Sequence, residues 1–212
     1  MNFIRRIALV KRFFAVVTAV STILIATQAL ANDTASRGWA GCYTGIQGGY
    51  GAGDYTRSVT RYGDIKGGFV GGTLGCNIEA NSFIWGWEGD LAWASIFDVP
   101  HPNAKVNWIG SARLRTGIEA SPYTLLYVTG GLGLGHNVLK SNWSGIPESN
   151  THFGWVAGAG AEWMLGNNWT AKIEYLHYDL GAENYSYFRS GLGVRIDTVK
   201  LGVNYRFNSG LR

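Results

Sequence analysis

Charged residues recur at every second position in several segments of the sequence, a spacing that places side chains on one face of a β-strand. Glu88 and Asp90 form one such pair, and Arg113 and Arg115 form another. Carboxylates held near guanidinium groups in a confined site could relay protons or act as acid and base catalysts. The full set of charged candidates is Glu88, Asp90, Arg113, Arg115, Glu162, Lys172, Glu174, Lys200 and Arg206. We expect these opposite charges to neutralise one another for structure rather than to catalyse a reaction, since a confined charge left unpaired is costly.

The four histidines are candidates for a metal or haem site because imidazole is a common ligand. They are His101, His136, His152 and His177, and they lie in long predicted connections or beside them. Alternation turns His136 and His177 to the opposite face from His152, and the sequence has no HxxxH or CxxC spacing. We therefore expect no bound metal and no cofactor.

Motifs for nucleophilic or phosphate chemistry are weak. No His-x-Ser occurs, and the run His177-Tyr178-Asp179 has no serine beside it. The glycine-rich segment 130–135 lacks the lysine and the following helix of a phosphate-binding loop. The expectation is that the chain is not an enzyme.

The elements that carry these residues are strands. Eight segments alternate with a period of two, which predicts β-strands rather than helices. In the segment 83–95, for example, Trp85 and Trp87 share one face while Glu88 and Asp90 share the other. The predicted strands span approximately 40–50, 68–78, 83–95, 107–118, 123–135, 152–164, 169–179 and 196–207.

One face of every predicted strand is free of charge through its centre and carries aromatic residues toward its ends, while the other mixes glycine with charged residues. Alternation of this kind fits a soluble sandwich as well as a membrane barrel. The aromatic ends and the balanced charges favour the barrel, since outer-membrane barrels have aromatic girdles at both interfaces. Inward-facing glycines such as Gly131, Gly158 and Gly160 are expected to make room for long charged side chains.

The connections give an independent indication. Long segments (51–67, 96–106, 136–151 and 180–195) alternate with short ones (79–82, 119–122 and 165–168). Transmembrane barrels have short periplasmic turns and longer extracellular loops. The sequence therefore predicts an all-β fold, an eight-stranded antiparallel up-and-down transmembrane β-barrel, with both termini in the periplasm. Trp143, Tyr185, Tyr187 and Phe188 in the long loops are candidates for a recognition surface.

The first 31 residues have the pattern of a cleaved signal peptide: a basic start, an apolar stretch and Ala29-Leu30-Ala31 at the end. Residues 32–212 then form the barrel domain. Four of the 18 basic residues lie in this leader, which leaves 14 basic residues against 14 acidic ones. A neutral remainder gives no reason to expect nucleic acid as a partner.

Cys42 and Cys76 lie near the same end of two neighbouring predicted strands and have matching parity. A cross-strand disulfide is one possibility in an oxidising periplasm, and two free thiols in lipid are the other.

Seven ordered segments of the chain resemble the small porin-like outer-membrane immunogenic proteins, also described as opacity-protein-like surface antigens. They are residues 39–50, 86–90, 113–117, 127–132, 158–162, 169–181 and 203–207. The resemblance covers nearly all of the chain after the leader and implies an OmpA-like eight-stranded barrel without a shared catalytic site. It also implies an outer-membrane location, with lipid and lipopolysaccharide and the barrel-assembly machinery as partners.

The resemblance identifies Phe207 with the terminal aromatic residue that signals barrel assembly in the family. Here residues 208–212 follow it, and cysteines stand at positions 42 and 76 where the family tends to have aromatic residues. We expect a structural and surface-antigen role in the envelope. The alternatives are a narrow porin for ions or small solutes, and binding of haemin or of an extracellular ligand through the loops.

Overall fold

The computed structural model describes residues 38–57, 60–98, 104–140, 147–183 and 192–207. The predicted signal peptide (1–31), the loop aromatics at 143, 185, 187 and 188, His101 and the segment after Phe207 lie outside these residues. Among the described residues, no helix is long and apolar enough to cross a membrane.

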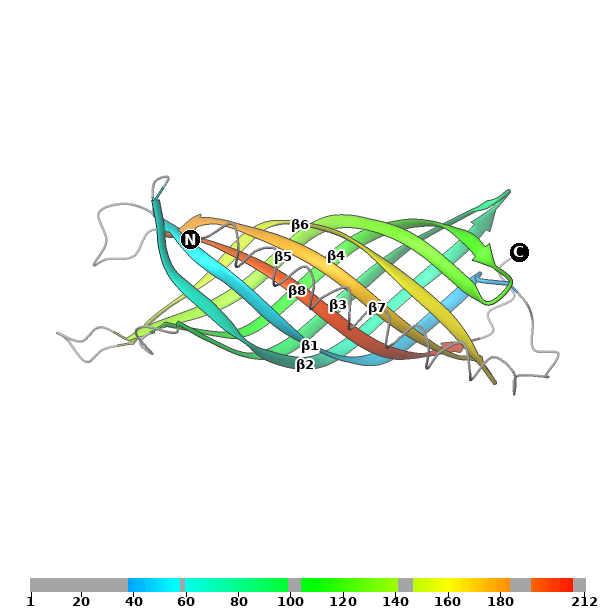
Figure 1. Cartoon of the computed structure of the whole chain (residues 1–212), viewed down its shortest axis with the longest axis horizontal. Helices are drawn as coiled ribbons and strands as arrows, with labels where there is room; N and C mark the ends of the chain where they lie inside the picture. Colours follow the sequence, from blue (N-terminus) through cyan, green and yellow to red (C-terminus); the bar gives the residue numbers. More distant parts are fainter. Residues whose placement is uncertain (1–37, 58–59, 99–103, 141–146, 184–191, 208–212) are drawn as a thin grey trace, which may run out of the picture.

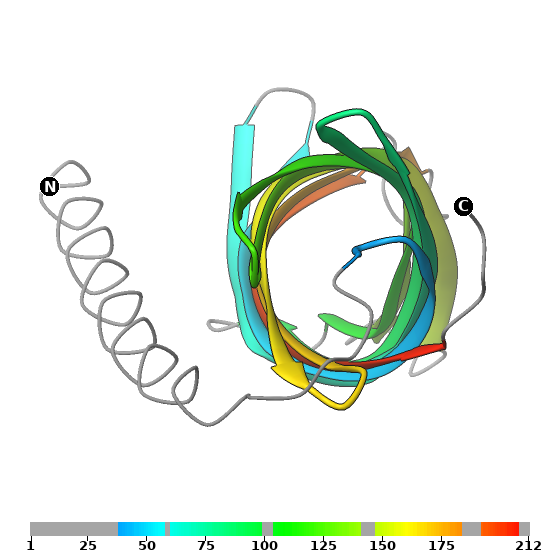
Figure 2. The ribbon, with the colours of Figure 1, turned by 90° about the vertical axis from the view of Figure 1, so that its right-hand side faces the viewer.

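Eight antiparallel strands close into one barrel, each paired with its neighbours in the sequence, and β1 pairs with β8 to complete the ring. Figure 1 shows the strands tilted along the barrel, and Figure 2 shows the closed ring from one end. The predicted fold class is confirmed. The strands are β1 (Gly41–Arg57), β2 (Thr60–Ala80), β3 (Phe83–Asp98), β4 (Ala104–Ser121), β5 (Thr124–Lys140), β6 (Pro147–Gly166), β7 (Trp169–Glu183) and β8 (Leu192–Phe207).

The strand register fixes the tilt. Following paired residues around the ring from Asp54, through Arg195 on β8 and Trp155 on β6, leads back to β1 at Thr44, ten positions away. A stagger of this size in eight strands belongs to a tilted, narrow barrel whose interior is filled by side chains.

Tight turns gather at one end of the barrel, which we call the turn end; the opposite end is the loop end. Asn81, Asn167 and Asn168 have positive φ angles of 57°, 49° and 68°. Asparagine tolerates this conformation better than most residues, and two successive residues with positive φ form a turn whose twist suits a hairpin. These turns set the register of the hairpins they close.

The strands are longer than the alternation predicts. β1 runs to Arg57 and β2 starts at Thr60, so most of the predicted loop 51–67 is strand. The other three long connections shorten in the same way, to 99–103, 141–146 and 184–191. The prediction was wrong at these boundaries because it used an apolar outward face as its signal. Beyond the lipid-facing band the strands remain paired, although their outward side chains are no longer consistently apolar.

The exterior carries large apolar side chains, including Ile46, Trp85, Trp93 and Leu114, all about half exposed or more. Charged side chains of the middle of the strands are buried inside the barrel. This arrangement is the reverse of a soluble protein and matches a barrel whose outer face contacts hydrocarbon.

Candidate functional site: the filled barrel interior

The middle of the interior is a layer of four acidic and four basic side chains, all buried: Glu88, Asp90, Glu162, Glu174, Arg113, Arg115, Lys172 and Lys200. β3, β4, β6, β7 and β8 supply them. Each points inward because it occupies the parity opposite to the apolar exterior. The equal numbers of each sign make this central layer neutral.

Arg113 is the basic residue with the most ion pairs in the layer. Its guanidinium contacts Glu88 at 2.6 Å, Asp90 at 2.9 Å and Glu174 at 2.8 Å. Glu88 lies directly opposite Arg113 in the β3–β4 ladder, whereas Glu174 reaches it from β7. The planar guanidinium suits this role because its fixed set of donors can satisfy several carboxylates at once.

Arg115 makes a second set of contacts one step nearer the turn end. It pairs with Glu162 on β6 at 2.7 Å and with Glu88 at 3.3 Å. It also donates to the Tyr43 hydroxyl at 2.9 Å, and its guanidinium lies 4.2 Å from the centre of the Tyr127 ring. Ion pairing and ring contact together hold this cation across the width of the barrel.

The two lysines connect opposite walls. Lys172 on β7 contacts Glu88 on β3 at 2.7 Å, and Lys200 on β8 contacts Asp90 on β3 at 3.0 Å. Because these strands are far apart in the ring, the contacts cross the interior. Lys200 also donates to the Tyr178 hydroxyl at 3.0 Å.

Neutral polar groups complete the coordination of the carboxylates. Tyr43 donates to Glu88 at 2.6 Å, and Ser111 donates to Asp90 at 2.5 Å. Thr170 and Asn204 donate to the same oxygen of Glu162, at 2.6 Å and 3.0 Å. A buried charge is tolerated when pairing and hydrogen bonds both satisfy it, and this layer meets both conditions for each carboxylate named here.

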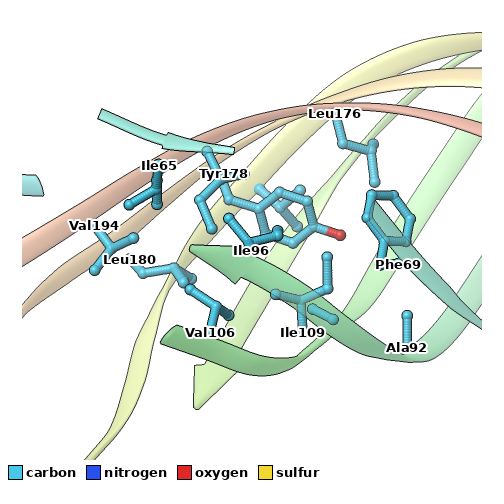
Figure 3. Close-up of a cluster of buried hydrophobic side chains, with 13 residues drawn as sticks. Ile65, Phe69, Ala92, Ile96, Val106, Ile109, Leu176, Tyr178, Leu180 and Val194 are labelled. Carbon is cyan, nitrogen blue, oxygen red and sulfur yellow. The ribbon is translucent and has the colours of Figure 1, made fainter. Parts of the chain in front are cut away.

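The loop-end half of the interior is apolar, whereas the sequence pattern predicts glycine and charged residues on the inward face. Ile65, Ile96, Leu180 and Ile196 are almost completely buried there, together with Tyr178. In Figure 3 the side chains of Ile65, Ile96, Tyr178 and Leu180, which come from β2, β3 and β7, lie together inside the barrel. The inward face is therefore not a uniform mixture of glycine and charge; it has an apolar packing layer above the ionic one.

The turn end is closed by the segment that precedes β1. Trp39 is 1% exposed and packs inside the barrel against Ile84, Leu125 and Tyr127. Asn77 donates to the Trp39 carbonyl at 3.3 Å. A large aromatic ring thus fills the turn-end mouth.

Arg206 belongs to this closure rather than to the central layer. Its guanidinium donates to the carbonyls of Gly38 and Ala40, the latter at 3.1 Å, and lies 5.7 Å from the Trp39 ring. Among the described residues no ion pair joins it to the acidic groups of the layer. Arg206, which the sequence placed in the lumen charge cluster, lies on the turn-end side of that cluster, because its position near the end of β8 places it level with the chain that enters β1.

Cys42 and Cys76 face each other across the β1–β2 ladder and form a disulfide with an S–S distance of 2.09 Å. Of the two alternatives left open by the sequence, the structure has the bridge. It ties the start of β1, three residues after Trp39, to the residue beside Asn77. The link therefore holds together the two strands that anchor the turn-end closure.

The three histidines within the described ranges, His136, His152 and His177, do not converge. His152 is buried and contacts the Gly181 carbonyl, whereas His136 stacks on Trp108 and His177 contacts Asp197 on the outer face. The part of the chain that the structure describes holds no cluster of three or more residues suited to a metal ion.

Inward glycines make room for different neighbours: a Cβ atom at Gly202 would lie 3.2 Å from the Lys172 side chain, whereas others lie against rings and leucines. A Cβ atom at Gly160 would lie 2.6 Å from the Tyr127 ring, and one at Gly135 would lie 2.5 Å from Leu180. The expectation that Gly131, Gly158 and Gly160 accommodate long charged side chains was wrong, because the atoms nearest to these glycines belong to other groups. These close contacts are with aromatic rings, leucine side chains and neighbouring backbone.

Two kinds of interior residue were missed from sequence. Tyr43, Tyr127 and Tyr178 have inward parity, and that signal could have identified them. Trp39 precedes the first strand, so alternation carries no information about where its ring lies.

A closed barrel of eight strands, apolar outside and ion-paired inside, defines a β-barrel of the outer-membrane class. Residues 17–207 match the family described as outer membrane protein beta-barrel domain. The chain belongs to this family.

Curated relatives agree. The chain is 33% identical over 207 residues to the 31 kDa outer-membrane immunogenic protein of Brucella melitensis, covering 80% of this chain and 84% of the relative. It is 34% identical over 173 residues to the 22 kDa outer membrane protein of Rhizobium leguminosarum bv. viciae, covering 80% and 78%. The resemblance to outer-membrane immunogenic proteins is confirmed.

Among solved structures, Neisserial surface protein A matches with a TM-score of 0.52 at 14% identity, covering 79% of this chain and 99% of the other. The outer membrane protein AlkL matches with a TM-score of 0.50 at 12% identity, covering 85% and 97%. At these identities the likeness concerns the fold alone. The protein is thus an outer-membrane β-barrel of a surface-antigen family.

Proposed function

We propose that this protein is a closed, non-catalytic barrel that stabilises the envelope and displays its long connections at the cell surface. The observation that carries the proposal is the continuous filling of the interior: an apolar layer at the loop end, an ionic layer in the middle and Trp39 at the turn end. These three successive layers would block the passage of a solute through the barrel.

The proposal includes an orientation. The tight turns would face the periplasm and the long connections the outside, because outer-membrane barrels have this asymmetry. The leader would direct export, with assembly reading Phe207 at the end of β8 and outer-membrane lipid and lipopolysaccharide surrounding the finished barrel. A protease accessibility assay on intact cells tests it, since cleavage should occur in the segments 141–146 and 184–191 and not at the turn around Asn167.

A non-catalytic role agrees with the chemistry of the central layer. Each carboxylate there is held by a cation or a hydroxyl donor, as the ion pairs of Glu88 and the hydrogen bonds of Glu162 illustrate. A general acid or base needs a free path to a substrate, and these groups are buried between apolar layers.

Conductance in a planar bilayer tests the closed barrel against a narrow porin. We expect the wild-type protein to give no steady ion current. As a positive variant, replacing Ile96, Arg113 and Trp39 together with alanine removes one large side chain from each of the three layers and should introduce current. A steady single-channel current from the wild-type barrel would refute the proposal.

A further inference from the structure

The outer surface of the barrel has a groove with apolar side-chain walls. It has a volume of about 480 Å³ and crosses β6, β7, β8, β1 and β2. The outward side chains around it are Ile46, Val70, Trp163, Ala171, Ile173, Leu201 and Val203, with Gly48 among them. The inward residues Gln47, Lys172 and Gly202 lie beneath it.

The groove exists because small residues stand among large ones. Gly48 has no side chain and Ala171 has one methyl group, whereas Ile46, Val70 and Leu201 are 73%, 63% and 52% exposed and project from the surface. A Cβ atom added at Gly48 would have Phe69 O at 3.5 Å as its nearest neighbour, which is ordinary contact. The barrel wall therefore does not require glycine here, and the hollow is a property of the outer face.

The position of the groove indicates its environment. One end reaches Trp163, close to the turn end of β6, where the aromatic pair Trp169 and Tyr205 also lies. The other end reaches Val70 on β2. Aromatic residues at a barrel end mark the membrane interface, so the groove runs from that interface into the hydrocarbon region.

We propose that this groove binds one acyl chain of a phospholipid from the leaflet at the turn end, which is the periplasmic leaflet if the orientation proposed above holds. An unbranched hydrocarbon chain can lie along a narrow hollow and contact a floor and two walls. Those added contacts favour it over a chain touching only the convex exterior, because dispersion attraction grows with the number of close neighbours.

A second copy of the barrel fits less well. A stable protein interface buries roughly 1,000 Å² or more of surface with good complementarity. The groove accepts only a few side chains, and its raised rim at Ile46 and Leu201 would hold another convex barrel away from the floor. The shape thus favours a single flexible chain.

Native mass spectrometry after reconstitution tests the proposal. The barrel would be inserted into vesicles of phosphatidylethanolamine and phosphatidylglycerol, extracted in mild detergent and weighed. We expect wild-type protein to retain one phospholipid. Gly48→Leu fills the groove from β1 and should lose that lipid.

Gly130→Leu is the matched control. Gly130 is also outward-facing, a Cβ atom there would have its nearest neighbour at 3.7 Å, and it lies on β5 outside the groove. This variant should retain the lipid. Ala171→Leu fills the same hollow from β7 and replaces Gly48→Leu if the latter does not fold, as judged by heat-modifiable gel mobility.

Equal lipid retention by wild-type, groove-filled and control proteins would overturn the proposal. So would a wild-type mass corresponding to a dimer that Gly48→Leu converts to a monomer, since a second copy would then occupy the groove. Neither result depends on conductance, so failure here is distinguishable from failure of the closed-barrel function.

Discussion

Replacing Arg113 with alanine should destabilise the barrel far more than replacing Lys105. Arg113 makes ion pairs with three carboxylates, and the side chains involved are at most 1% exposed. Lys105 lies near the loop end, where it contacts only one ring, that of Phe97 at 5.2 Å, in the described contacts. The comparison separates a buried cation from one at the rim.

The magnitude follows from the charge left behind. Without Arg113 the central layer has four acidic groups against three basic ones, and breaking a buried pair by removing one partner costs about 3–5 kcal/mol. A cation over an exposed ring contributes about 0.5–1 kcal/mol. We therefore expect Arg113→Ala to lower the free energy of unfolding by at least about 2 kcal/mol more than Lys105→Ala does.

The assay is equilibrium unfolding in urea after insertion into lipid vesicles, with the folded fraction read from gel mobility without boiling. Adding Glu174→Gln to Arg113→Ala restores three charges of each sign, so the double variant should be more stable than the sum of the single effects predicts. Equal stabilities for Arg113→Ala and Lys105→Ala, or strict additivity in the double variant, would refute the view that ion pairing holds this layer together.

Three further predictions follow from other parts of the barrel. Trp39→Ala should reduce the free energy of unfolding by about 3–5 kcal/mol, as the loss of other large core rings does, measured by the same urea assay. A loss under about 1 kcal/mol, well below that range, would mean that the ring does not seal the turn-end mouth. Cys42 and Cys76 should react with iodoacetamide only after reduction, and reduction should cost about 2–4 kcal/mol. Spin labels at Ala112 and Ala159 should be accessible to oxygen in the bilayer and shielded from a water-soluble nickel complex. The opposite accessibility would refute the assignment of these two residues to the lipid-facing side of the barrel.

Alternation predicted the fold well because the membrane imposes it on every strand. The outward side chains must be apolar where they meet lipid, so faces such as that of Trp85 and Trp87 are visible in the sequence. The same constraint placed Glu88 and Arg113 on the inward faces of neighbouring strands, and the β3–β4 register adds that they lie directly opposite each other.

The interior could be predicted only in part, since no comparable constraint acts on it. Inward positions tolerate charges, rings or aliphatic groups as long as the space is filled, so Ile96 and Leu180 in the apolar layer gave no clear signal. Trp39 lies before the alternating region altogether. The ends of the strands could not be predicted either, because strand segments that extend beyond the lipid need no apolar outward face.

The stratified interior also explains how the strands find one register. A slip of one residue would turn Glu88 and Arg113 toward lipid, which is costly for charged groups in the hydrocarbon region. A slip of two residues keeps both faces correct, and the apolar exterior cannot distinguish it, since leucine, alanine and glycine recur there. The ion pairs can: Glu88 lies opposite Arg113, and moving it by two positions would separate it from Lys172 across the barrel while displacing Asp90 from Lys200. The lipid-facing side chains therefore decide which face is out, and the buried charges decide which residues are neighbours.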